Sequence, residues 1–155
     1  MSAEKEENYV WVLSRLKETL VEEPKVIFTD RDLVLMGAVA SVFPLSKHML
    51  CREHIRRNIE DRVKKNMGAA TTKAFVREAL HLFDSATELD YEQRLSAMRE
   101  KWKHHWGLIR YLEMNWLDPY KDRIIACWTH QYTVFGNTTT NRYVYASCIL
   151  MSCYI

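Results

Sequence analysis

The short apolar run Lys25–Thr29 (KVIFT) constrains the fold of this chain more than any other feature of its sequence. Its β-branched and aromatic residues favour an extended strand, and Pro24 and Asp30 bound it on either side. A short apolar run that is fenced in this way is typical of a buried strand. The rest of the chain must therefore supply apolar segments that pack against a sheet.

The segments that follow this run alternate between helix and strand. Apolar residues recur at helical spacing from Leu33 to Phe43, and Pro44 ends that stripe. The run Lys47–Cys51 predicts a second strand, and a basic amphipathic helix is expected over Arg52–Lys65. The order strand, helix, strand, helix predicts a parallel pair of strands joined by a right-handed crossover.

Most of the remaining chain has helical periodicity. We expect helices near residues 8–21, 75–86, 91–106, 108–117 and 124–135. Asp90 is the expected N-cap of the third of these helices, and the stretch DPYKD is expected to separate the last two. Trp102, Trp106, Trp116 and Trp128 are expected to pack in the core.

The composition sets limits on the class of protein. The chain has 155 residues, of which 48% are hydrophobic and 27% charged, which is ordinary for a globular domain and argues against general disorder. Its net charge of +2 is too small to indicate nucleic-acid binding by itself. No run is long enough for a membrane span, and the acidic start MSAEKEEN does not resemble a secretory leader. Reduced cysteines in the cytosol or nucleus are expected.

Two aspartates stand where the first strand gives way to a helix. Thr29 and Asp32 fit a capping box, in which the Thr29 hydroxyl would cap the helix and the Asp32 carboxylate would reach back. Alternatively, Asp30 at the strand tip could hold Mg²⁺ or Mn²⁺, because ligands bind at such tips in open α/β sheets. One carboxylate alone does not make a two-metal site.

Two further motifs have a structural and a functional interpretation. Cys51 and His54 have the spacing of metal ligands on a helix, and Cys127 with His130 repeats it, but Cys51 also lies on an apolar stripe where a buried thiol is common. Zinc is therefore not expected.

The basic helix carries Arg52, Arg56 and Arg57. These side chains could bind a DNA backbone, or they could form the solvated face of an amphipathic helix.

The order of these motifs along the chain resembles the MULE-type transposase domain of Mutator-like elements and of the plant regulators derived from them. The resemblance rests on NYVWVLSRL, VIFTDRDLVLMGAVASVFP, HMLCREHIRRNI and WLDPYKDRIIACWTHQYTVFGNTTTNR, and it covers about residues 7–142. It implies an RNase H-like fold with a helical insertion. It also implies DNA as partner, nuclear location, and two Mg²⁺ or Mn²⁺ ions held by a triad of acids for DNA cleavage and strand transfer.

The resemblance assigns roles to particular residues. Asp30 matches the second acid of the triad, and Cys51 with His54 matches the family's C-x-x-H, with a structural or active-site-adjacent role. The implied domains are a partial RNase H-like α/β segment over residues 7–66, a helical insertion over 67–135 and a divergent C-terminal segment over 136–155.

The chain also departs from the family pattern. The first acid would lie before the chain begins, and Val144 stands where the third acid is expected. The uncharged end after Arg142 resembles a frame slip, a misread splice site or decay.

We therefore predict a truncated RNase H-like α/β fold with a large helical insertion, predominantly helical by residue count. The predicted function is that of a catalytically inactive transposase fragment, with no bound Mg²⁺ or Mn²⁺ and no small-molecule substrate. Asp30 would then act only at the N-terminus of the helix. The alternative is a domesticated module that binds DNA or protein without catalysis.

Overall fold

The structure is a computed structural model that describes residues 3–132 and 148–150. The chain divides into two compact units: unit 1 consists of Met1–Cys51 together with Tyr132–Ile155, and unit 2 consists of Arg52–Gln131. The prediction of a predominantly helical chain is confirmed. Over the part of the chain that the structure describes, no helix combines the length and the apolar character that crossing a bilayer requires.

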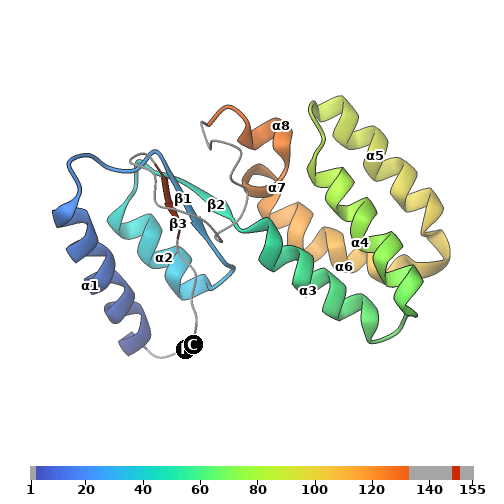
Figure 1. Ribbon diagram of the computed structural model, residues 1–155, viewed down its shortest axis with the longest axis horizontal. Helices are drawn as coiled ribbons and strands as arrows, with labels where there is room; N and C mark the ends of the chain where they lie inside the picture. Colours follow the sequence, from blue (N-terminus) through green and yellow to red (C-terminus); the bar gives the residue numbers. More distant parts are fainter. Residues whose placement is uncertain (1–2, 133–147, 151–155) are drawn as a thin grey trace. The chain divides into compact units, whose positions relative to one another are not determined.

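Unit 1 contains a small parallel sheet and two helices (Figure 1). Its described elements are α1 (Ala3–Thr19), β1 (Val26–Thr29), α2 (Leu33–Val42), β2 (Lys47–Leu50) and β3 (Cys148–Leu150). The strand order is β2–β1–β3, and β1 runs parallel to both neighbours. The parallel pair predicted from the sequence is confirmed, with a register from Val26 opposite Lys47 to Thr29 opposite Leu50.

The central strand β1 is buried along its whole length because its side chains pack on both faces of the sheet. Ile27 belongs to a cluster with Leu13 of α1 and Leu35 of α2. Val26 and Phe28 point the other way and pack with Met49 of β2. The period of two along a strand thus places one residue under the helices and its neighbours on the opposite face.

The start of α2 differs from the predicted capping box. Asp32 is the N-cap, and its Oδ1 accepts hydrogen bonds from the amides of Val34 at 2.8 Å and Leu35 at 3.2 Å. The prediction that Thr29 caps the helix is wrong, because Thr29 still belongs to β1 and is fully buried. Asp30 lies two residues before the N-cap, so the predicted helix-terminal role belongs to Asp32 instead.

Unit 2 is helical throughout its described elements. These are α3 (Arg52–Lys64), α4 (Ala69–Phe83), α5 (Glu88–Lys101), the short 3₁₀ turn η1 (Lys103–His105), α6 (Trp106–Leu112), the π-helical turn η2 (Glu113–Leu117), α7 (Asp118–Ile124) and α8 (Ala126–Thr129). Short connections join α3, α4 and α5, which therefore run in alternating directions (Figure 1).

Aromatic side chains fill the core of unit 2. Phe75 and Trp102 meet edge to face with ring centroids 5.0 Å apart, and the Trp102 indole N–H donates to Glu78 Oε2 at 2.7 Å. Trp116 is also buried, which confirms the expectation for these two tryptophans. The same expectation is wrong for Trp106, which is 53% exposed at the start of α6.

The N-cap of α5 is Thr87 rather than the predicted Asp90. The Thr87 hydroxyl accepts a hydrogen bond from the Asp90 amide at 3.1 Å, and Asp90 Oδ2 accepts one from the Ala86 amide at 3.0 Å. Thr87 and Asp90 therefore form a reciprocal cap, in which Asp90 is the third residue after the N-cap and its side chain reaches back to the chain before the helix.

The stretch DPYKD does not break the chain into two helices as predicted. Asp118 begins α7, and Pro119 lies in its first turn. Proline is tolerated there because the first N–H groups of a helix have no hydrogen-bond partner within the helix. The wider π-helical turn η2 comes immediately before it and connects α6 to α7. A proline that was read as a separator thus lies inside a continuous helical run.

We predict that Asp32→Ala lowers the free energy of unfolding by about 1 kcal/mol, because two amides of α2 lose their acceptor. Burial raises the pKa of Asp32, but hydrogen bonds from Leu35, Val34 and Lys5 outweigh it and hold that pKa below its ordinary value. The ionised carboxylate therefore stabilises the fold above its ordinary pKa, and this effect is lost as the pH falls through the lowered value.

Urea unfolding at pH 7 and at pH 3 measures both effects of this substitution. Asp61→Ala is the matched control, because Asp61 is exposed and forms no ion pair with the residues that the structure describes. An equal loss of stability in both variants would contradict the capping role of Asp32.

Candidate functional site

Asp30 lies at the carboxyl end of β1, in the turn that leads to α2. Its side chain is half-buried, with Oδ1 inside the protein. The carboxyl ends of parallel strands are where open α/β sheets bind ligands. The structure thus places Asp30 at a position where a carboxylate can act on a ligand.

The polar groups next to Asp30 are already engaged with one another. The Thr29 hydroxyl lies 2.7 Å from the Asp30 carbonyl oxygen, to which it donates, and 2.6 Å from His48 Nε2. Asp32 caps α2, and its Oδ2 lies 3.3 Å from Lys5 Nζ and accepts from the Tyr9 hydroxyl at 3.5 Å. Asp32 is therefore occupied structurally and is not a second ligand beside Asp30.

The described residues do not fit the pair of divalent ions that the resemblance implies. Nowhere in residues 3–132 and 148–150 do three His, Cys, Asp or Glu side chains gather in a way that could hold a metal ion. Two ions about 4 Å apart need several carboxylates, and Asp30 is the single matching acid in this part of the chain. Val144, at the predicted place of the third acid, lies outside the described residues.

Cys51 is the residue between β2 and α3, and His54 lies in the first turn of α3. Cys51 is 1% exposed, and its amide donates to the Thr29 carbonyl oxygen at 2.8 Å, so its position is that of a buried core thiol. Ile55 and Ile59 continue the buried stripe along α3. In α8, burial raises the pKa of the Cys127 thiol.

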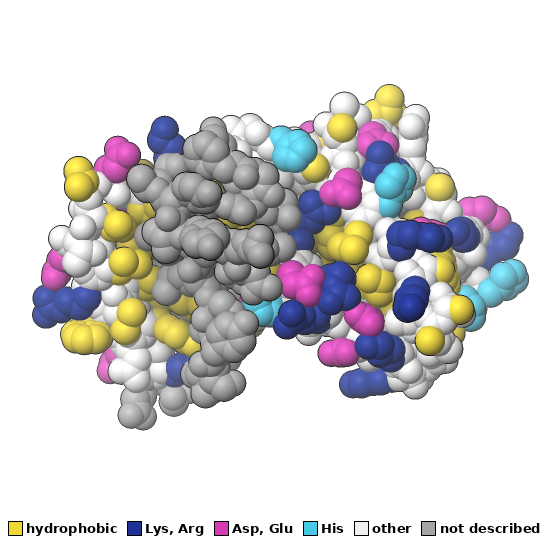
Figure 2. Space-filling model, in the orientation of Figure 1, with side chains coloured by type: hydrophobic (Ala, Val, Ile, Leu, Met, Phe, Trp, Pro, Cys, Tyr) yellow, Lys and Arg dark blue, Asp and Glu magenta, His cyan; other side chains and the backbone are white. Residues whose placement is uncertain are grey.

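Carboxylates of unit 2 bind three arginines of α3, Arg52, Arg56 and Arg57. Arg52 donates to Asp84 Oδ1 at 2.6 Å and lies over the Phe83 ring. Figure 2 shows acidic and basic side chains side by side rather than in a uniform basic patch.

Glu53 is the centre of this ion-pair network. Arg56 donates to Glu53 at 2.8 Å and to Glu60 at 2.6 Å, and Arg57 donates to Glu53 at 2.9 Å. The hydrogen bond from Arg56 is the largest influence on the Glu53 carboxyl; burial opposes it, Arg57 adds to it, and the pKa of Glu53 falls to about 2. The network is therefore fully ionised at neutral pH.

Two cations that the sequence analysis did not single out lie on α4. Lys73 and Arg77 are exposed, are four residues apart and form no ion pair with the residues that the structure describes. They line a groove of about 510 Å³ between α3 and α4, with Val76 and Leu80 among the other lining residues. The i,i+4 spacing of two cations next to an apolar stripe was visible in the sequence.

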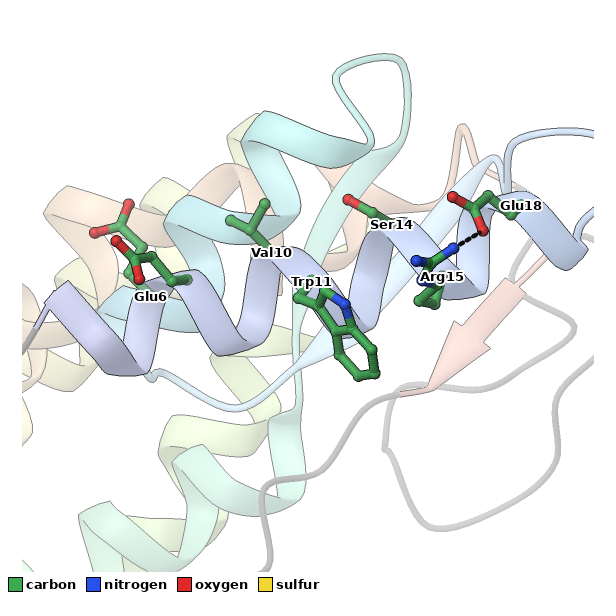
Figure 3. A pocket seen from close by; sticks show the side chains of 7 residues that line it. Glu6, Val10, Trp11, Ser14, Arg15 and Glu18 are labelled. Carbon is green, nitrogen blue, oxygen red and sulfur yellow. Dashed lines mark hydrogen bonds and ion pairs between the residues drawn. The ribbon is translucent and has the colours of Figure 1, made fainter.

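A shallower depression of about 610 Å³ follows one face of α1 (Figure 3). Trp11 is 63% exposed there and lies beside Arg15, whose guanidinium carbon is 5.9 Å from the ring centroid. Arg15 also pairs with Glu18 at 2.8 Å. Because its lining comes from a single helix, this surface brings no catalytic groups together.

Comparison with protein families shows that residues 1–58 match the MULE transposase domain. This part of the chain is similar to that domain, and the match covers 58 of the 155 residues. No curated protein and no solved structure matches the chain. The matched residues run from α1 into α3 and include Asp30, Cys51 and His54.

The match confirms the resemblance drawn from the motifs over residues 1–58. The strand–helix–strand order of β1, α2 and β2 lies inside the matched residues, as do the three α3 arginines singled out from the sequence. The later helices, α4 to α8, lie outside the match.

We predict that Glu53→Gln lowers the free energy of unfolding by about 0.5–1 kcal/mol, the usual contribution of two helical ion pairs. Because its folded-state pKa of about 2 lies below its ordinary 4.5, Glu53 stabilises the protein above pH 4.5 and loses this effect as the pH falls toward 2. An NMR titration of the Glu53 side chain measures the pKa directly. Glu92→Gln, which removes an exposed carboxylate of α5, is the control and should leave the stability unchanged.

Proposed function

We propose that this chain is part of a Mutator-like DDE-type transposase, and that unit 1 is a partial RNase H-like fold. The match of residues 1–58 to the MULE transposase domain carries this proposal. The parallel pair β1–β2, joined through α2, and the position of Asp30 at the carboxyl end of β1 support it. In this proposal Asp30 is the second acid of the catalytic triad.

The chain as it stands is proposed to be catalytically inactive. Phosphodiester cleavage of this kind needs two divalent ions that stabilise the attacking and leaving oxygens, and a cluster of carboxylates must hold them. Within the described residues Asp30 has no such cluster, because Asp32 is committed to the N-cap and to Lys5. Mg²⁺ sheds its water reluctantly, so one carboxylate gives only weak binding.

We predict that the purified chain does not cut or join DNA in Mg²⁺ or Mn²⁺. Linear duplexes and duplexes carrying transposon ends are incubated with the chain and with its Asp30→Asn variant, and the products are resolved on denaturing gels. Circular dichroism establishes that both proteins are folded. Cleavage by the natural chain that disappears in Asp30→Asn would show that the triad is complete and would overturn the proposed inactivity.

A second candidate function is DNA or protein binding without catalysis. For DNA, the supporting observation is that α3 keeps exposed cations: the side chains of Arg57 and Lys64 are 55% and 56% exposed although each contacts a glutamate. A DNA phosphate would compete with Glu53 for Arg57, so this surface is proposed to bind DNA weakly and without sequence preference. Nuclear location is proposed on the same basis.

We predict that the joint variant Arg57→Ala and Lys64→Ala weakens binding to duplex DNA and lowers the slope of log affinity against log salt by about 2, one unit for each lost phosphate contact. Glu53→Gln is expected to act in the opposite direction, because it releases Arg57 from its internal partner. Fluorescence anisotropy with a labelled duplex at several salt concentrations measures both. Arg110→Ala, an exposed arginine of α6, is the control, and equal slopes in all variants would exclude α3 as the DNA surface.

A further inference from the structure

The groove between α3 and α4 combines an apolar lining with a charged rim. Its volume is about 510 Å³, and all of its lining residues belong to unit 2. Leu80 of α4, which is partly exposed, supplies the apolar part together with Val76, which is 8% exposed. Covering the apolar surface of a groove with another apolar group removes it from water, which favours binding.

The charges on the α3 side of the groove are neutralised internally. Arg56 is held by Glu53 and Glu60, and Glu60 also binds Lys64 at 2.7 Å. At the end of α4, Asp84 is held by Arg52 at 2.6 Å. These groups therefore offer little net charge to a ligand.

The rim formed by α4 keeps its positive charge. Lys73 and Arg77 line the groove and meet no carboxylate within the described ranges 3–132 and 148–150. Residues four apart lie on the same face of a helix, about 5–6 Å from each other. Two carboxylates one turn apart on another helix have nearly the same spacing, since the pitch of an α-helix is about 5.4 Å.

We propose that this groove binds an acidic amphipathic helix of a partner protein. Apolar side chains of that helix would cover Val76 and Leu80, and carboxylates one turn apart on its edge would pair with Lys73 and Arg77. Charge complementarity and the apolar lining together select this partner. A nucleic-acid backbone would satisfy the two cations but would leave the apolar lining uncovered.

The proposal can be tested with a synthetic, fluorescein-labelled helical peptide and the full chain. The peptide carries leucines at i, i+3 and i+7 and glutamates one turn apart along the edge of the leucine stripe. One control peptide replaces these glutamates by lysines, and another replaces the leucines by serines. A DNA duplex of similar length is the third control ligand, and anisotropy gives the affinity for each.

The joint variant Lys73→Glu and Arg77→Glu is expected to weaken binding of the acidic peptide by about tenfold or more. The joint variant Lys65→Glu and Arg110→Glu changes the net charge of unit 2 equally at exposed sites that do not line the groove, and it should bind as the natural chain does. Circular dichroism of both variants establishes that loss of binding is not loss of folding.

The other outcomes would overturn the proposal. Equal binding of the serine peptide would show that charge alone acts and that the apolar lining is not used. Binding of the duplex but not of the peptide, with the same loss in the α4 variant, would make the rim a nucleic-acid site. No binding of the acidic peptide, or equal binding by both variants, would exclude the groove as its site. The DNA-cleavage assay is independent of this test, because Lys73 and Arg77 lie outside the matched residues 1–58.

Discussion

The parallel pairing of β1 with β2 is the constraint on which unit 1 depends. Parallel strands cannot be joined by a tight turn, so the chain must cross over one face of the sheet, and α2 is that crossover. β1 has strand neighbours on both sides and buried side chains on both faces. The packing of α1 and α2 over Ile27 follows from the need to cover one of these faces. The same strand carries Asp30 at its carboxyl end, so the position of this acid is set by the core.

Much of unit 1 could be predicted because its signals are local. The strands and helices from β1 to α3 follow hydrophobic periodicity and the positions of Pro24 and Pro44, and each differs from its expected range by one residue at one end. The cap of α2 could not be chosen from the sequence, since Thr29 and Asp32 are both good N-cap residues. Only the length of β1 decides between them, and tertiary packing sets that length. The pairing of β3 with β1 joins residues far apart in the chain and leaves no local signature.

The ion pairs of α3 show a second limit on what can be predicted from the sequence. The sequence gives the number of arginines but not their partners, and the i,i+3 and i,i+4 spacing of Glu53, Arg56 and Glu60 is the only local hint. Asp84, which holds Arg52, is 32 residues away in sequence. The positive charge that the sequence of α3 indicates is therefore largely neutralised by carboxylates in the folded chain. The reverse holds for α4, whose composition is not strongly basic but whose Lys73 and Arg77 form no ion pair among the residues that the structure describes.

Unit 1 is assembled from two separated stretches of sequence, whereas unit 2 is continuous. Helical hairpins such as α3–α4 form from neighbours in the chain, which is a fast process. Bringing β3 beside β1 instead requires closing a loop that contains all of unit 2. The entropic cost of that closure is smaller when the intervening chain is already compact. We therefore expect the helices of unit 2 to organise early and the β1–β3 pairing to complete the fold.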